Sequence, residues 1–295
     1  MKDYQIRALL RVVETGSIRA AARSLQLSQP AVTKAIRELE AEVDAPLVLR
    51  GSRGVELTES GRQLAMRARL AQEQLSLALQ DIRQLQGGRQ ATVAAAVTPL
   101  VFMGVLPEVL REFRRTLPYA QIKLYEGLLP TVLPQLREGF IDFAIAGAVE
   151  EALASDLELD PIGLIEMVVV CRPGHPLAAA VRWEELVGAE WLVHRAPGSH
   201  HSVLFDQLRR TGLPVPERTV ETNSFGVSWG LVTRSDLLLT IPEAFLSMEP
   251  YARQVVRIPL DMRLPPLTLG ILKLRASPLS LAASKLATLF KRYAR

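Results

Sequence analysis

The chain has 295 residues, 48% of them hydrophobic and 22% charged, a composition typical of a globular protein too long for a single core. No apolar run reaches the roughly 18 residues of a membrane span, and the amino-terminal stretch is too charged for a secretory signal, so we expect a cytoplasmic protein without a membrane partner. Residues 1–90 carry all of the net charge of +4, with 14 Lys and Arg against 10 Asp and Glu, so a polyanionic partner is expected to bind there.

Two short amphipathic helices are predicted within residues 18–43, with a break at Gln26 and Leu27. Their apolar stripes recur at helical spacing and consist of Ile18, Ala21, Ala22 and Leu25, then Val32, Ile36, Leu39 and Val43. Ser28 is a typical N-cap residue, and Pro30 suits the first turn because proline lacks the N–H that would be unpaired there. This pattern predicts a helix-turn-helix.

The other face of the second helix carries side chains that can read DNA bases. Gln29, Thr33 and Arg37 fall at i, i+4 and i+8, with Lys34 beside them. Gln can pair with adenine and Arg with guanine, and Thr offers a hydroxyl and a methyl group. No carboxylate occurs in residues 15–37, where it would face phosphates. A solvated helical hairpin without a partner is the alternative that these residues leave open.

Residues 45–61 continue as two short strands, Leu47–Leu49 and Val55–Leu57, around a turn with a basic tip. In such a wing beside a recognition helix, Arg53 is expected in the minor groove and Arg50 on a phosphate. The complete set of expected DNA contacts is Ser17, Arg19, Ser28, Gln29, Pro30, Thr33, Lys34, Arg37, Arg50 and Arg53.

Residues 1 to about 61 resemble the winged helix-turn-helix of LysR-type transcriptional regulators. The matching positions are Gly16, Ser17, Ala21, Ala22, Leu25, Ser28, Gln29, Pro30, Ala31, Ile36, Leu39, Glu40, Leu47, Arg50, Leu57, Thr58 and Gly61. Departures from the usual residues occur at Leu9, Arg19, Asp44 and Val48. Asp tolerates a left-handed backbone, so Asp44 can still follow a helix end.

A long helix is predicted from the cap residue Thr58 to Gly87 and Gly88. A narrow apolar seam follows it at heptad spacing and consists of Leu64, Ala68, Ala71, Leu75, Ala78, Ile82 and Leu85. A helix of roughly 40 Å cannot pack along one small domain, so we expect a homodimer. A helix folded back on its own C-terminal domain is the alternative, to which Met66, Leu70 and Leu77 point. The resemblance implies that two dimers pair into a tetramer.

From residue 91, short apolar strands alternate with helices, which predicts two α/β lobes around parallel sheets. The chain is expected to cross between lobes near Gly163 and again near Pro265 and Pro266. The predicted domains are the winged helix-turn-helix at 1–58, the linker helix at 59–87, a first lobe at 91–162 plus 267–295, and a second lobe at 163–266. The expected fold class is an α+β winged helix-turn-helix, a linker helix and a two-lobed α/β domain. The family resemblance implies that this domain is an effector domain similar to periplasmic solute-binding proteins.

A ligand is expected beyond the carboxyl ends of the strands, where helix N-termini favour anions. This rule selects Thr98, Pro99, Leu100, Leu128, Leu129, Ala146, Gly147, Pro197, Gly198, Ser199, His200, Asn223, Ser224 and Phe225. The resemblance implies that Thr98 and Ser199 are polar anchors for a small organic acid. The alternative is that Thr98, Ser199 and Ser224 only cap helices.

Catalysis and metal binding are not expected. Ser199 adjoins two histidines, but neighbours in a chain rarely form a nucleophile and base pair, and no G-x-S-x-G turn occurs. The 4 His and 1 Cys show no HExxH or CxxC spacing, so no metal or cofactor is expected. Cys171 lies in a predicted buried strand, where a redox role is not expected.

These patterns together predict a ligand-responsive transcriptional regulator, which binds an inverted repeat in double-stranded promoter DNA and has the transcription machinery as a further partner. One alternative is a DNA-binding regulator whose two-lobed domain serves only oligomerisation. A solute-binding protein would normally carry a signal peptide and no helix-turn-helix, and an architectural DNA-binding protein would not need two lobes.

Overall fold

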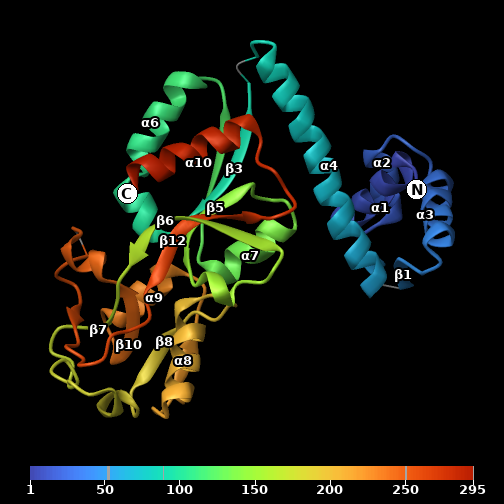
Figure 1. Ribbon diagram of the computed structural model, residues 1–295. Coiled ribbons are helices and arrows are strands. Elements are labelled where there is room, and N and C mark those ends of the chain that lie inside the picture. The colour runs from blue at the N-terminus through green and yellow to red at the C-terminus, as the bar shows by residue number, and fades with distance from the viewer. Residues whose placement is uncertain (52–53, 89, 250, 295) are drawn as a thin grey trace. The chain divides into compact units, whose positions relative to one another are not determined.

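The computed structural model describes residues 1–51, 54–88, 90–249 and 251–294, and the chain divides into two units (Figure 1). The first unit comprises residues 1–79 with 137–139, and the second comprises residues 80–136 with the chain from Phe140 onward. Each unit has a hydrophobic core of its own.

Three helices, a two-stranded sheet and the start of a long helix build the first unit. They are α1 (Asp3–Thr15), α2 (Ile18–Ser24), α3 (Gln29–Val43), β1 (Val48–Gly51), β2 (Gly54–Leu57) and α4 (Glu59–Leu85). The predicted stripe of α3 is buried except for Val43, which is 37% exposed. Helix α1, which sequence analysis did not identify, contributes Leu9 and Val12 to the same core. The predicted winged helix-turn-helix is therefore confirmed as a fold.

Caps set the ends of α3 as the residue types predict. The Oγ of Ser28 accepts a hydrogen bond from the N–H of Ala31 at 3.3 Å. At the other end Asp44 adopts a left-handed conformation with φ of 49°. The carboxylate of Glu40, in the last turns of α3, accepts hydrogen bonds from the backbone N–H groups of Leu47 and Val48 at 2.8 and 3.2 Å. Glu40 thus ties the first strand of the wing to α3.

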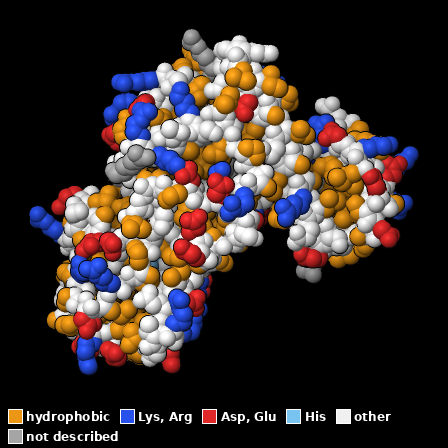
Figure 2. Space-filling model, viewed as in Figure 1, with side chains coloured by type: hydrophobic (Ala, Val, Ile, Leu, Met, Phe, Trp, Pro, Cys, Tyr) orange, Lys and Arg blue, Asp and Glu red, His pale blue; other side chains and the backbone are white. Residues whose placement is uncertain are grey.

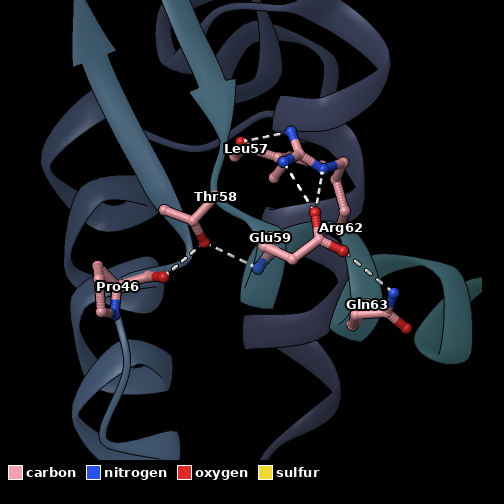
Figure 3. Close-up of polar contacts among 7 residues, drawn as sticks. Pro46, Leu57, Thr58, Glu59, Arg62 and Gln63 are labelled. Carbon is pink, nitrogen blue, oxygen red and sulfur yellow. Dashed lines mark hydrogen bonds and ion pairs between the residues drawn. The ribbon is translucent and has the colours of Figure 1, made fainter.

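Thr58 joins the wing to α4 (Figure 3). Its hydroxyl donates to the carbonyl of Pro46 at 2.6 Å and accepts from the N–H of Gly61 at 2.9 Å. A Cβ atom at Gly61 would lie 2.0 Å from the carbonyl oxygen of Leu47, so only glycine fits there. The expected capping role of Thr58 is therefore confirmed.

Two five-stranded sheets form the second unit, and each organises one lobe. Lobe I has the strand order β4-β3-β5-β12-β6, with β3 (Thr92–Val97), β4 (Gln121–Glu126), β5 (Phe143–Ala148), β6 (Leu157–Ile165) and β12 (Leu267–Leu274). Its helices are α5 (Pro99–Gly104), α6 (Leu106–Thr116), α7 (Leu129–Arg137), α10 (Leu281–Tyr293) and the short η1 (Glu150–Ala152). Helices α6 and α10 lie side by side, joined by Glu112 to Arg292 and Tyr293 (Figure 1).

Lobe II has the strand order β11-β7-β10-β8-β9. The strands are β7 (Met167–Cys171), β8 (Glu190–Val193), β9 (Thr219–Glu221), β10 (Leu237–Pro242) and β11 (Val256–Arg257). The helices are η2 (Trp183–Leu186), α8 (His200–Thr211), α9 (Phe225–Val232) and η3 (Glu243–Ser247). The predicted two-lobed α/β domain is confirmed.

The sheets are mixed rather than parallel, which corrects the prediction. Strand β3 is parallel to β4 and β5, and β8 is parallel to β9 and β10, as helix crossovers require. Strand β12 is antiparallel to β5 and β6, and β7 is antiparallel to β10 and β11. Strands β6 and β12 belong to the segments that lead out of lobe I and back into it, without a crossover helix that would make them parallel.

The first crossing between lobes lies close to the expected one near Gly163, two residues further along the chain. Strand β6 pairs with β12 as far as Ile165, so the chain leaves lobe I after that residue. The run from Asp160 to Gly163 has the composition of a turn, yet it lies within β6. The register shifts between Leu269 and Gly270, and this irregularity accommodates the interrupted strand.

Candidate DNA-binding face and ligand cavity

The surface of α3 presents the side chains that sequence analysis assigned to base reading. Gln29, Lys34 and Arg37 are exposed and Thr33 is half-buried, whereas the opposite face of the helix lies in the core. In Figure 2, Lys and Arg side chains lie along the right-hand edge of the view, which α3 forms, together with acidic side chains. The helix thus offers an amide, a hydroxyl and two cations to solvent.

Most cations of α2 and α3 make no ion pair within the described residues. Arg19, Arg23 and Arg37 have no carboxylate partner there, whereas the ammonium of Lys34 lies 3.8 Å from Glu38. Glu38 also accepts a hydrogen bond from the Tyr4 hydroxyl at 2.7 Å, and this bond lowers the pKa of the Glu38 carboxyl. The ion pair was missed in sequence analysis, although Glu38 stands one helical turn after Lys34.

The remaining predicted DNA contacts lie in the turn and the wing. Ser17 caps α2, since its Oγ accepts from the N–H of Ala20 at 3.4 Å, and Ser28 and Pro30 are exposed at the start of α3. Arg50 lies in β1 opposite Val55. Arg53 lies outside the described residues.

The apolar seam of α4 divides into two parts. Ala68 is buried in the core of the first unit, and Leu64 packs against that core, so these two positions are used within the protomer. Leu75, Ile82 and Leu85 are 68%, 51% and 77% exposed, and Ala71 and Ala78 are exposed as well. Leu79, which was not assigned to the seam, widens this apolar surface with 56% exposure.

A cavity of about 110 Å³ lies between the two lobes of the second unit. Lobe I contributes residues that follow β3 and β4, together with Gly147 near the end of β5, and lobe II contributes the start of α8 and side chains of β10. Among the described residues that line it, none is Lys, Arg, Asp or Glu. The cavity is thus largely apolar with a few uncharged polar groups.

Most of the residues predicted to contact a ligand line this cavity. Those that do are Thr98, Pro99, Leu100, Leu128, Leu129, Gly147, Ser199, His200 and Phe225. Those that do not are Ala146, Pro197, Gly198, Asn223 and Ser224. Ala146 is enclosed within β5, and Pro197 and Asn223 are exposed. Ser224 caps α9 instead, because its Oγ accepts from the N–H of Val227 at 3.3 Å.

The two expected polar anchors do not serve as side-chain caps. Neither Thr98 nor Ser199 makes a side-chain cap hydrogen bond with the helix that follows it, so the capping alternative is wrong for both. The Ser199 hydroxyl accepts from the N–H of Ala196 at 3.1 Å and donates to the carbonyl of His194 at 3.0 Å. Ser199 therefore holds the loop before α8.

The polar centre of the cavity wall was not predicted from the sequence. The Oγ1 of Thr240, on β10, lies 3.0 Å from Nδ1 of His200 and 3.0 Å from Nε2 of His201. The backbone N–H of His194 donates to Nδ1 of His201 at 3.2 Å. Of these residues only His200 was predicted to contact a ligand. Thr240 lies about forty residues further along the chain, so no local sequence pattern indicates that β10 contacts α8.

Burial keeps these imidazoles uncharged near neutral pH. Desolvation lowers the pKa of His200 to about 4, which the nearby carbonyl of Pro265 offsets only in part. Desolvation also holds the pKa of His201 well below its usual value, helped by the two neighbouring histidines and Arg195. The pKa of His194 is lowered by burial despite a hydrogen bond with the carbonyl of Thr222.

Cys171 is buried in β7, and burial raises the pKa of its thiol to about 11. A thiol in this state is a poor nucleophile. Within the described residues no group of three His, Cys, Asp or Glu side chains is arranged to hold a metal ion. In the same part of the chain, no helix has the length and apolar character of a membrane span.

A winged helix-turn-helix joined by a long helix to a two-lobed α/β domain defines the class of ligand-responsive transcriptional regulators. Residues 4–62 match the bacterial regulatory helix-turn-helix protein model of the lysR family, and residues 86–295 match the LysR substrate binding domain. The chain belongs to the LysR family of transcriptional regulators.

One relative in sequence and two in fold match along the whole chain. The transcriptional regulator TdcA of Escherichia coli (strain K12) is 29% identical over 293 residues, covering 99% of this chain and 93% of TdcA. Full-length LysG from Corynebacterium glutamicum with bound effector Arg has a TM-score of 0.66 at 20% identity, covering 100% of this chain and 98% of that one. Full-length CbnR complexed with its target DNA has a TM-score of 0.63 at 18% identity, covering 99% and 100%. These relatives are regulators rather than enzymes.

Proposed function

We propose that the protein is cytoplasmic and binds an inverted repeat in promoter DNA through two copies of α3, each in a major groove. The single observation that carries this proposal is the exposed face of α3, whose opposite side forms the core of the first unit. On α3, the side chains that read bases are Gln29, Thr33, Lys34 and Arg37. Arg19 and Arg50 contact phosphates, and Arg53 enters the minor groove. Ser17, Ser28 and Pro30 position the backbone of the turn against DNA.

The two copies are joined through α4. Its exposed positions from Ala71 to Leu85 form a stripe that an isolated protomer leaves in water. Covering this stripe with the same stripe of a second copy buries apolar surface and sets two recognition helices at a fixed separation. Two such dimers pair into a tetramer.

The cavity binds the effector, a small organic acid. One ordered water needs roughly 10–15 Å³ of cavity volume. The cavity volume of about 110 Å³ is therefore large enough for a small organic molecule. The lining offers uncharged donors and the uncapped amino terminus of α8, a helix of 12 residues, where the helix dipole stabilises an anion. The absence of a lysine or arginine among the described lining residues favours a single carboxylate over a more highly charged ligand.

Effector binding alters DNA binding by changing how the two lobes sit against each other. The cavity is lined by residues from both sheets, so a ligand that contacts both lobes favours one interlobe arrangement over others. Because α4 enters the second unit directly, such a change is transmitted to the spacing of the recognition helices. The gene next to the operator then responds through contacts with the transcription machinery.

The test of DNA recognition is to recover genomic fragments with the purified full-length protein and to sequence them. We expect one enriched motif with inverted symmetry. A Gln29→Ala variant should recover a motif with relaxed preference at one position in each half-site, whereas Gln121→Ala, an exposed Gln of the second unit, should recover the parental motif. Fragments without any shared motif would contradict the proposal.

A further inference from the structure

The hydrogen-bonded chain in the cavity wall has a fixed direction. A backbone N–H can only donate, so Nδ1 of His201 is an acceptor, and the hydrogen of this neutral ring lies on Nε2. That hydrogen is donated to Oγ1 of Thr240. The hydroxyl of Thr240 then has its own hydrogen available for Nδ1 of His200.

This order places the hydrogen of His200 on Nε2. If it lay on Nδ1, Thr240 would receive two N–H groups, and its hydroxyl hydrogen would lack an acceptor within the described chain. The bonds of the Thr240 hydroxyl are all satisfied only in the Nε2–H form of His200. Thr240 therefore acts as a positioning residue that selects the tautomer of His200.

The selected hydrogen has no acceptor. His200 is 5% exposed and lines the cavity, and its Nε2 has no hydrogen-bond partner among the described residues. The backbone carbonyl of Pro265 lies near the ring and raises the pKa of His200, but no hydrogen bond joins it to Nε2. Buried donors are rarely left unpaired in folded proteins. A donor of this kind in the wall of a ligand-sized cavity indicates that an acceptor arrives with the ligand.

We propose that His200 Nε2–H donates to a carboxylate oxygen of the effector, and that the hydroxyl of Thr240 holds it in the donating tautomer. Helix α8 begins at His200, and Ser199 does not cap it with its side chain. The first backbone N–H groups of α8 can therefore donate to the second carboxylate oxygen. This inference rests on the proposed effector site and adds the side chain and the chemical group that meet there.

The test is a nitrogen NMR spectrum of the full-length protein labelled with 15N at histidine, without DNA. Its 4 His can be assigned by single substitution, with His200→Gln identifying the relevant ring. We expect a neutral His200 ring with hydrogen on Nε2 before any ligand is added. Titration with sodium butyrate should move the Nε2 resonance saturably, whereas butylammonium, a donor of equal length, should not move it.

Two variants separate the positioning role from general loss of structure. Thr240→Val removes only the hydroxyl and should populate the Nδ1–H tautomer and weaken butyrate binding at least tenfold. Thr233→Val, which removes a hydroxyl bonded within α9 and outside the cavity, should change neither. An Nδ1–H tautomer in the parent protein, equal butyrate affinity in Thr240→Val, or no distinction between the two probes would overturn the inference.

The anchor and the regulatory role can fail separately. The tautomer and the butyrate response are measured without DNA. A negative result in these measurements excludes His200 as the donor to the carboxylate and does not contradict the proposed function. An Nε2–H ring that responds to butyrate, combined with DNA binding that responds to no small carboxylate, would retain the anchor and count against the effector function.

Discussion

At the scale of single residues, the buried histidines make stability depend on pH. The pKa of His200 is near 6.5 when the chain is unfolded and about 4 when it is folded. Between these values the unfolded chain binds a proton that the folded chain does not. The contribution of His200 to the free energy of unfolding is therefore complete above pH 6.5 and is lost as the pH drops toward 4. Below pH 4 both states are protonated, and this loss stops.

We expect His200 to account for a loss of about 3 kcal/mol in unfolding free energy between pH 7 and 4. All 3 Trp residues belong to the second unit, so tryptophan fluorescence in urea titrations follows its unfolding. In His200→Gln, an uncharged replacement that keeps a donor, the unfolding free energy should fall less steeply with acid. Identical pH dependence in the parent and the variant would show that folding does not lower the pKa of His200.

Gln29 carries the sharpest prediction about base reading. Gln29→Ala removes the proposed bidentate pair with adenine and should cost about 1–3 kcal/mol of discrimination on the selected operator, with little loss on random duplex DNA. Fluorescence anisotropy with both DNAs at one salt concentration measures the ratio. Equal losses on the operator and on random DNA would assign Gln29 to the phosphate backbone.

At the scale of elements, local patterns predict α3 well and β6 poorly. The cap at Ser28, the proline in the first turn and an apolar stripe of helical period all agree for α3. In β6 the run from Asp160 to Gly163 indicates a turn, and only pairing with β12, more than 100 residues later, makes it a strand. Tertiary pairing overrides local preference there.

The exposed stripe of α4 predicts the oligomeric state. Leu75→Arg places a charge at the centre of the stripe and should reduce the protein to monomers in sedimentation equilibrium, because burying an unpaired charge is strongly unfavourable. Ser76→Arg introduces the same charge at the neighbouring exposed position outside the seam and should keep the parental mass. A Leu75→Arg variant with the parental mass would exclude α4 as the dimer interface.

At the scale of the whole molecule, sequence patterns predict the cavity only in outline. The rule that ligands bind beyond strand ends selects Thr98, Leu128 and Gly147, which all line it. The rule cannot select Thr240 or Phe245, which line the cavity from β10 and η3 and lie in segments with no ligand-binding pattern. Contacts between segments that are distant in the chain, such as that of Thr240 with His200, bring these residues to the cavity.

Thermodynamic linkage makes any coupling between the two units reciprocal. A small carboxylate that changes operator affinity by some factor must have its own affinity changed by operator DNA by the same factor. We expect isothermal titrations of the ligand, with and without saturating operator, to differ by about 5–150-fold, the usual range of such coupling. Equal ligand affinities would leave the two-lobed domain as an oligomerisation module.

The most direct measurement for the central claim compares two DNAs that differ only in the spacing of the half-sites. One carries the selected inverted repeat, and the other has five base pairs inserted at its centre, which turns the half-sites to opposite faces of the double helix. If two α3 helices bind as a symmetric pair, the insertion should lower the affinity of the full-length protein at least tenfold, toward that of a single half-site. Equal affinity for both DNAs would contradict paired recognition.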